Sequence, residues 1–428
     1  MKKQLFFILA CLGLYSNAQF TVKVNTTSDF SPKEAIMYTL NGSKDIISSK
    51  VTKKNNLWVF KFEKPYIGMM KIYFPENNNS INLISENRDV QVNLEINNNR
   101  IKDVVYLDDS NILMETMQDL QKKNEMIFPA LVQIKEYYKP NSDFGLALKK
   151  EIDRLNNNMI IDETKNPFVS YYRMNYGKFL TTNSVGKKPS IEEITKFITS
   201  TGSFLETSSL LRPILVSFLN SGDNAATIKN VDQLLQTVNI ETPRGQTVLS
   251  ELIDIFDVYD MSMLKNKYLT EAKNLKCTIN DRLAATIKSN KNVEMGAKFP
   301  NYVFNSANNT NAKSLYDVKT DKKVIVFWSS TCTHCEAELP KLLEKYNVLK
   351  QQNIEIIGFS IDADKDSYNK KIAALPWIND SELKGWNSSF VDTYNLHATP
   401  TFYILDSDNK IIYLPGNATE VLNYFKIK

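Results

Sequence analysis

The hydrophobic pattern of the first quarter of the chain alternates with a period of two. Between residues 20 and 106, short apolar or alternating runs such as residues 57–62 and 90–96 are separated by turn-forming residues, for example Asn41-Gly42. Alternation over runs of this length is typical of antiparallel strands. We therefore expect an all-β, sandwich-like domain over residues 19–108.

The pattern changes near Ser110, where apolar residues begin to recur every three or four positions. Leu148, Ile152 and Leu155 lie on one face of such a segment. Ser110 is a candidate N-cap, and Ser190 with Glu193 forms a candidate capping box. We expect an α-helical region over residues 109–290, whose apolar stripes form a core.

A third pattern follows a polar break at residues 289–292. The apolar run 324–328 reads as a buried strand, and a helical pattern follows it through residues 336–346. Further strands are expected at 354–360, 402–405 and 410–414, with a helix around 367–374. Strands that alternate with helices and end in a hairpin predict an α/β domain over residues 293–428.

Composition is that of a multidomain globular protein. The 428 residues are 43% hydrophobic and 23% charged, with a formal net charge of +4. A chain of this length exceeds one ordinary core, so two or three domains are expected. The small net charge gives no indication of nucleic-acid binding. After the first twenty residues, no apolar run is long enough to span a bilayer.

The first eighteen residues have the pattern of a secretory signal peptide. Lys2 and Lys3 precede an apolar stretch at residues 5–14, and small residues before Gln19 form a cleavage site. Lipidation of Cys11 is disfavoured because the apolar segment before it would be very short. We therefore expect an exported protein of the periplasm or cell envelope.

After removal of the leader, three cysteines remain: Cys277, Cys332 and Cys335. A disulfide framework in an exported protein of this size would carry many more, so the close pair suggests catalysis or a partial metal site. Cys332 lies where the strand gives way to the helix, and a helix N-terminus stabilises a thiolate. Cys277 is expected to be a packed thiol, or alternatively to pair with a cysteine of another protein.

Several residues around the pair occur in an order that matches a known family. They are Gly296, Pro300, Phe327-Trp328, Cys332, Cys335, Glu338, Pro340, Asp362 and Thr399-Pro400. From about Val293 the chain resembles exported thioredoxin-like thiol–disulfide oxidoreductases of the TlpA-like, cytochrome-maturation type, whose fold is related to that of AhpC/TSA proteins. The β-rich segment resembles a domain of unknown function found ahead of thioredoxin domains in long exported bacterial proteins.

The resemblance implies a role for the residues near the pair. Cys332 would attack a disulfide, and Cys335 would resolve the resulting mixed disulfide and form the redox-active Cys332–Cys335 bond. Glu338 would take the proton of Cys335, and a protonated His334 would favour the thiolate of Cys332. The alternatives for Glu338 and His334 are a solvated helix residue and an exposed turn residue.

The resemblance also implies how substrate binds. A cis-proline at Pro400 would leave the backbone of Thr399 free to bind an extended segment, and Trp328 would contribute to the same site. The partners would be thiols and disulfides of exported proteins, together with a membrane-borne or other electron donor. No cofactor and no metal are implied.

Two departures from the family leave the direction of electron flow open. Thr331 stands where the family commonly has tryptophan, and the pair Thr333-His334 resembles that of more oxidising relatives. A stabilised Cys332 thiolate stabilises the reduced protein and makes the pair a better oxidant. We expect reduction or isomerisation of disulfides in exported proteins.

Three other functions compete with thiol–disulfide exchange. Residues 19–290 carry no visible catalytic set, so the chain could be a client-binding or structural envelope protein with an accessory redox domain. A peroxidase is disfavoured because Ser329 replaces the threonine of related folds and no arginine follows Cys332. A zinc site built from Cys332, Cys335, Cys277 and His397 lacks a second closely spaced ligand pair.

Overall fold

The computed structural model describes residues 19–156, 161–181, 189–221 and 226–427. The predicted leader, including Cys11, lies outside these residues. The described chain forms two compact units. The first contains Ile46–Met174, and the second contains most of the chain from Asn175 onward together with Leu40–Asp45. Each unit is described by itself below.

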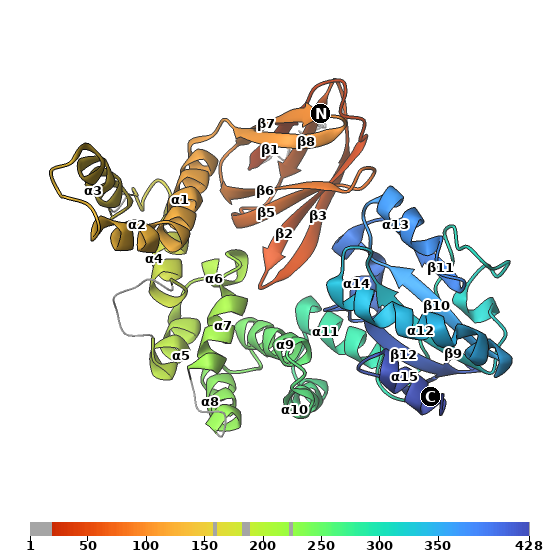
Figure 1. The fold of residues 1–428 in the computed structure, drawn as a ribbon. Coiled ribbons are helices and arrows are strands. Elements are labelled where there is room, and N and C mark those ends of the chain that lie inside the picture. Colours follow the sequence, from red (N-terminus) through yellow and green to blue (C-terminus); the bar gives the residue numbers. More distant parts are fainter. Residues whose placement is uncertain (1–18, 157–160, 182–188, 222–225, 428) are drawn as a thin grey trace, which may run out of the picture. The chain divides into compact units, whose positions relative to one another are not determined.

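Two four-stranded sheets form the N-terminal β region (Figure 1). Their strands are β1 (Phe20–Asn25), β2 (Glu34–Asn41), β3 (Lys44–Thr52), β4 (Leu57–Phe62), β5 (Ile67–Phe74), β6 (Asn79–Glu86), β7 (Val90–Asn97) and β8 (Arg100–Tyr106). The orders are β4-β1-β7-β8 and β3-β2-β5-β6, with β1 and β7 parallel. Alternate residues such as Trp58, Ile72 and Val92 are buried in one shared core, as the period-two pattern predicts.

Helices make up the middle of the chain. They are α1 (Asp109–Met126), α2 (Phe128–Lys135), α3 (Asp143–Asn156), α4 (Pro167–Phe179), α5 (Ile191–Ser200), α6 (Phe204–Thr207), α7 (Leu211–Asn220), α8 (Thr227–Val238), α9 (Pro243–Val258), α10 (Ser262–Lys273) and α11 (Asp281–Asn292). The Ser190 capping box is present. The cap of α1 is Asp108 rather than Ser110, because the carboxylate of Asp108 accepts the backbone N–H of Asn111.

The C-terminal domain is built on a five-stranded sheet in the order β11-β10-β9-β12-β13. Its elements are β9 (Lys322–Trp328), α12 (Thr333–Gln351), β10 (Ile354–Ser360), α13 (Lys365–Ile372), β11 (Ile378–Ser381), α14 (Ser389–Thr393), β12 (Thr401–Asp406), β13 (Ile411–Tyr413) and α15 (Ala418–Tyr424). Strands β9, β10 and β11 are parallel, and β12 runs antiparallel to β9. The predicted combination of all-β, helical and α/β regions is confirmed.

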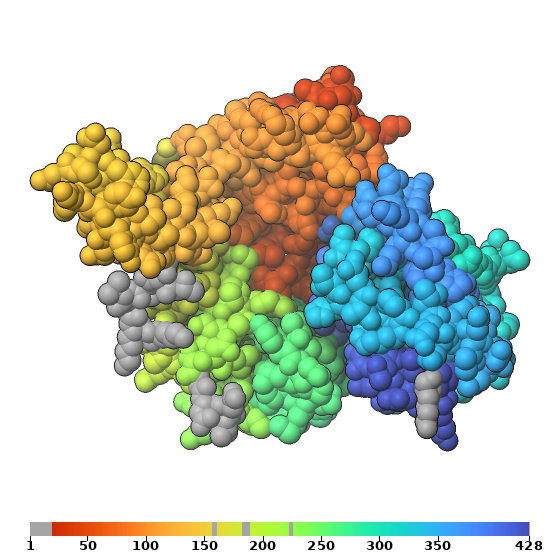
Figure 2. Space-filling view, viewed as in Figure 1, coloured from red at the N-terminus to blue at the C-terminus, as the bar shows by residue number. Residues whose placement is uncertain are grey.

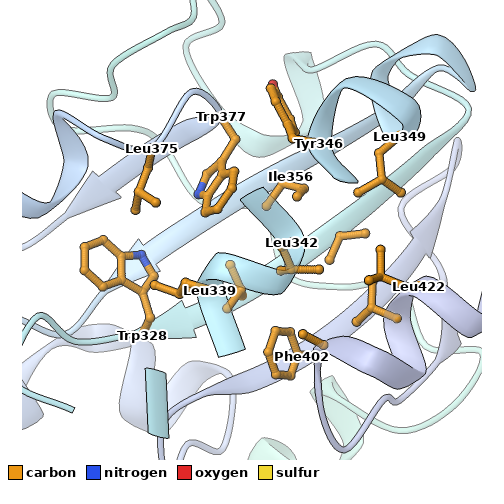
Figure 3. Packing of buried hydrophobic residues seen from close by; sticks show 14 of the residues in the cluster. Trp328, Leu339, Leu342, Tyr346, Leu349, Ile356, Leu375, Trp377, Phe402 and Leu422 are labelled. Carbon is orange, nitrogen blue, oxygen red and sulfur yellow. The ribbon is translucent and has the colours of Figure 1, made fainter. Parts of the chain in front are cut away.

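The central strand β9 is buried on both faces. Val324, Val326 and Trp328 pack with residues of α12, α13 and α15, whereas Ile325 and Phe327 pack with α14 and the segment from Phe299 to Val318. Figure 3 shows Trp328 with Leu339 and Leu342 of α12 in the first of these clusters. In the space-filling view, the residues in the colour range of α12 and α13 form part of the visible surface of this domain (Figure 2). A strand enclosed in this way explains the continuous apolar run in the sequence.

The structure departs from the predicted pattern in other places as well. Helix α11 continues to Asn292, so the polar residues 289–292 end a helix rather than break the chain. Strand β11 has the sequence Ile-Asn-Asp-Ser, which carries no strand signal, and α14 is only five residues long. Tertiary pairing with β10 overrides the weak intrinsic preference of β11. Among the described residues, no helix is both long enough and apolar enough to cross a membrane.

Candidate active site

The two cysteines lie where β9 passes into α12. Cys332 is the N-cap of α12, and its Sγ accepts the backbone N–H of Cys335 at 3.2 Å. Cys332 is partly exposed, whereas Cys335 is fully buried, and both thiols are free. The helix start therefore presents one reachable sulfur and keeps the second directly behind it, as the strand–helix pattern predicts.

The environment separates the acidities of the two thiols. Partial burial opposes ionisation of Cys332, but hydrogen bonds from the Cys335 thiol, Thr399 and nearby backbone amides outweigh it and lower the pKa of Cys332. Burial and the neighbouring Cys332 sulfur raise the pKa of Cys335 to about 12. One thiol is thus prepared to act as a thiolate and the other is held as its protonated partner.

This difference predicts selective alkylation at Cys332. Because its pKa is lowered, the thiolate persists as pH falls below the range in which an ordinary cysteine protonates, and is lost only near the folded-state pKa. We expect iodoacetamide to modify Cys332 faster than Cys335 at neutral pH, with a pH midpoint below that of the same residue in denaturant. Mass spectrometry of peptides alkylated across a pH series measures both rates; equal rates, or equal midpoints in the folded and denatured chain, would contradict the assignment.

A buried carboxylate holds the loop that precedes Cys332. Asp362, which is 4% exposed, accepts hydrogen bonds from the Ser329 hydroxyl at 2.8 Å and from the Ser330 backbone N–H at 2.9 Å. It also accepts the hydroxyl of Ser360 at 2.7 Å. The family pattern indicates Asp362 but not the serines, because isolated serines carry no signal in the sequence. This network fixes the turn from which the nucleophile projects.

The segment containing Pro400 lies against the first cysteine. The Thr399–Pro400 peptide bond is cis. The Cys332 thiol donates to the Thr399 carbonyl at 3.2 Å, across 67 positions of sequence. Thr399 and Pro400 are both half-buried, so part of this backbone remains accessible beside the sulfur. The structure thus brings together Cys332, Cys335, Thr399 and Pro400.

Glu338 and His334 lie on the same helix as the cysteines but differ in their surroundings. The carboxylate of Glu338 accepts from the Lys341 ammonium at 2.7 Å and from the Ala418 backbone N–H at 2.7 Å. Burial opposes ionisation, yet these bonds keep the pKa of Glu338 below its ordinary value. His334 is exposed, and its backbone amide contributes to the stabilisation of the Cys332 thiolate.

Trp328 does not reach the surface. Its side chain has no exposed area and lies in the core beside Tyr368, with ring centroids 6.1 Å apart. The predicted contact with substrate therefore has no accessible indole in this structure. The alternating burial of β9 explains this, because Trp328 points to the face that α12 covers.

A cavity of about 430 Å³ opens next to Thr331, the residue that precedes the nucleophile. Its walls include the apolar side chains of Leu339, Leu343 and Leu375 together with Lys370 and Lys371 of α13. The family pattern commonly has tryptophan at position 331, and the small Thr331 stands at the cavity edge instead.

The four residues counted as possible zinc ligands have other partners. The Cys277 sulfur accepts from the Gln246 side chain at 3.3 Å, and His397 lies 3.4 Å from Asp257. Within the described part of the chain, no three or more His, Cys, Asp or Glu side chains are grouped so as to hold a metal ion.

Residues 321–411 match a protein-family model described as thioredoxin-like. Thiol-disulfide oxidoreductase ResA of Bacillus cereus is 27% identical over 125 residues, which are 28% of this chain and 68% of the relative. ResA of Bacillus subtilis is 22% identical over 137 residues, or 32% of this chain and 75% of the relative. A solved domain of a possible thiol-disulfide isomerase from Cytophaga hutchinsonii is 27% identical, with a TM-score of 0.28, covering 31% of this chain and 92% of that one.

The family-model match, over residues 321–411, includes both Cys332 and Cys335. The cysteine pair at the start of a helix and the thioredoxin-like match concern the same residues. The C-terminal part of this chain is therefore a thioredoxin-like domain related to the thiol–disulfide oxidoreductases of the ResA type.

Proposed function

We propose that the protein is an exported thiol–disulfide oxidoreductase that reduces or isomerises disulfides of exported proteins, with Cys332 as the nucleophile. The observation that carries this proposal is the position of the Cys332 sulfur. It caps α12, accepts the backbone N–H of Cys335, and lies 3.2 Å from the Thr399 carbonyl beside the cis-proline. The backbone N–H of Cys335 at the helix start stabilises this sulfur as a thiolate, and its partial exposure leaves it open to a second chain.

The proposed exchange proceeds in two displacements. The Cys332 thiolate attacks one sulfur of a client disulfide, the client S–S bond breaks, and the departing client thiolate takes a proton from solvent. Cys335 then loses its proton and attacks the Cys332 sulfur, which releases the second client thiolate. The client gains two electrons, and the enzyme pair becomes a disulfide that an external dithiol donor must reduce.

Proton removal from Cys335 is the demanding step, since its pKa is about 12. Formation of the mixed disulfide removes the negative charge on Cys332, which is one cause of the high pKa of Cys335. Glu338, three residues further along the helix, is the proposed proton acceptor. Its carboxylate is held by Lys341 and Ala418 in the described state, so acceptance requires an exchange of these partners.

Recognition of a polypeptide client is supported by two features next to the sulfur. The half-buried Thr399 offers backbone groups to an extended segment, in the manner of strand addition. The cavity beside Thr331 combines an apolar wall with Lys370 and Lys371 at its rim, which suits a side chain next to the client cysteine. Export is supported by the leader-like pattern of residues 1–18.

Trapping of a mixed disulfide tests the proposal. In Cys335→Ser the first displacement proceeds but the resolving thiol is missing, so a client should remain covalently bound through Cys332. We expect a disulfide-containing test peptide to form an adduct with this variant that dithiothreitol releases. The matched control is Cys332→Ser/Cys335→Ser, which lacks the attacking sulfur. An adduct that forms equally with the control, or at Cys277, would contradict the assignment of Cys332.

A further inference from the structure

The loop that carries Thr399 is held by helices that precede the thioredoxin-like domain in sequence. Asp257, at the C-terminal end of α9, accepts a hydrogen bond from the Asn395 side-chain amide at 2.5 Å. The same carboxylate oxygen lies 3.4 Å from Nε2 of His397. Both residues belong to the connection between α14 and β12, and His397 is two positions before Thr399.

Further bonds fasten this connection. The other carboxylate oxygen of Asp257 accepts from the Lys265 ammonium at 2.7 Å, which orients the carboxylate. From α11, the Ser289 hydroxyl lies 2.9 Å from the amide oxygen of Asn395, and Asn292 donates to the Thr393 carbonyl at 2.9 Å. Three helices, α9, α10 and α11, therefore contribute to one anchor.

The anchored segment has little freedom to move independently. Leu396, between the two side chains held by Asp257, is 2% exposed and belongs to the core beneath the sheet. Asn395 has a φ of 50°, a backbone conformation in which asparagine is tolerated better than most residues. The Asp257 and His397 side chains are each only 20% exposed, so solvent competes weakly for their contact.

We propose that Asp257 is a positioning residue for the thiol–disulfide exchange, because its hydrogen bond with Asn395 and its contact with His397 set the position of Thr399 against the Cys332 sulfur. The inference rests on the proposed role of Cys332 as the nucleophile. The contact that transmits the effect is the side-chain hydrogen bond of Thr399 to the Cys332 sulfur, which lowers the pKa of Cys332; the Thr399 carbonyl, 3.2 Å from the same sulfur, accepts only from the protonated thiol. Hydrogen bonds weaken steeply once their geometry is lost, so a loosened loop stabilises the thiolate less.

The direction in which the pKa of Cys332 shifts distinguishes a loss of positioning from a loss of negative charge. Loss of the side-chain hydrogen bond from Thr399 removes stabilisation of the thiolate and raises the pH at which Cys332 ionises. Loss of the negative charge of Asp257 acts in the opposite sense, because a nearby carboxylate disfavours a thiolate. Asp257→Ala removes both the anchor and the negative charge. Asn395→Gly removes the anchor without a change of charge, and glycine tolerates the positive φ at this position.

The test measures the pH profile of Cys332 alkylation in the full chain by site-resolved mass spectrometry. We expect both Asp257→Ala and Asn395→Gly to move the midpoint upward by about half a pH unit, which lowers the rate at pH values well below the midpoint roughly threefold. Asp232→Ala is the matched control: Asp232 pairs with Lys267 and Tyr268 between α8 and α10, and its removal should leave the midpoint unchanged.

Unchanged midpoints in both variants would overturn the proposal, and so would a downward shift in Asp257→Ala, which would indicate an electrostatic effect alone. If Asp257→Ala fails to fold, Asn395→Gly decides the question. Alkylation requires no turnover, so this test is independent of the test of the proposed function. Absence of exchange activity in the wild-type chain would overturn the proposed function, and the alkylation midpoints would still show whether Asp257 positions the loop.

Discussion

Replacement of Cys332 by serine is expected to reduce dithiol-dependent reduction of insulin to the background rate. A serine hydroxyl at the start of α12 receives the same backbone bond but does not ionise near neutral pH and forms no disulfide. The expected loss is on the order of a thousandfold or more, as for removal of a catalytic nucleophile in other enzymes. The measurement is the turbidity of reduced insulin with dithiothreitol as the electron source.

Cys277→Ser is the matched control for this experiment. Cys277 is a half-buried thiol bonded to Gln246 in the helical region, and the same atom exchange there should leave the rate within about twofold of the wild type, as for a substitution away from the chemistry. Activity that survives in Cys332→Ser would refute the proposed mechanism. Loss of activity in Cys277→Ser would place a second thiol in the reaction.

Replacement of Arg282 by alanine is expected to destabilise the second compact unit by about 3–5 kcal/mol, the usual effect of breaking a buried ion pair from one side. The Arg282 side chain is 1% exposed and contacts Glu251 at 3.1 Å and Asp254 at 2.6 Å. These carboxylates are 0% and 3% exposed. Without Arg282 they retain, among the described residues, the ion pairs with Arg212, which is 29% exposed. The urea unfolding transition of the full chain measures the effect.

The matched control for Arg282 is Arg154→Ala. Arg154 pairs with Glu151 on α3 at 2.6 Å, but both side chains are more than 40% exposed, so its loss should shift the unfolding transition far less than the loss of Arg282 does. Burial opposes ionisation of Glu251, yet Arg282 and Arg212 hold the pKa of Glu251 below its ordinary value. Its contribution is therefore present above the unfolded-state pKa and is lost as pH falls through the folded value. Equal shifts in the two variants would contradict a special role of the buried cluster.

Cys332 and Arg282 lie in different parts of the second unit. Chemistry is concentrated at the end of β9, while the helices α7, α9 and α11 are joined by a buried ionic cluster. Asp257 lies one residue before the end of α9, the helix that also carries Glu251 and Asp254. The helix stabilised by the cluster is thus the one that we propose to position the loop of Thr399.

The local pattern of hydrophobic and polar residues was sufficient to predict most of the fold. Period-two alternation in strands such as β1, β4 and β7, and the recurrence of apolar residues every three or four positions in helices such as α3, reflect which face of each element is buried. That information is repeated along each element. In the structure, the N-cap of α1 is Asp108 instead of the predicted Ser110, and α11 continues through Asn292. Strand β11 could not be predicted because its four residues become a strand only by pairing with β10.

The sequence by itself determined the cysteine pair and its place at a helix start, because a buried strand, a short turn and a helix are all local features. It also indicated Thr399-Pro400 through resemblance to a family. Only the tertiary structure decided which distant residues meet near the site. Thr399 contacts Cys332 although 67 positions separate them, and Asp362 binds Ser329 across 33 positions. Asp257 binds Asn395, in the loop that leads to Thr399, across 138 positions. These contacts depend on the sheet order and on the packing of α9 and α11, and hydrogen bonds between single polar side chains leave no periodic trace in a sequence.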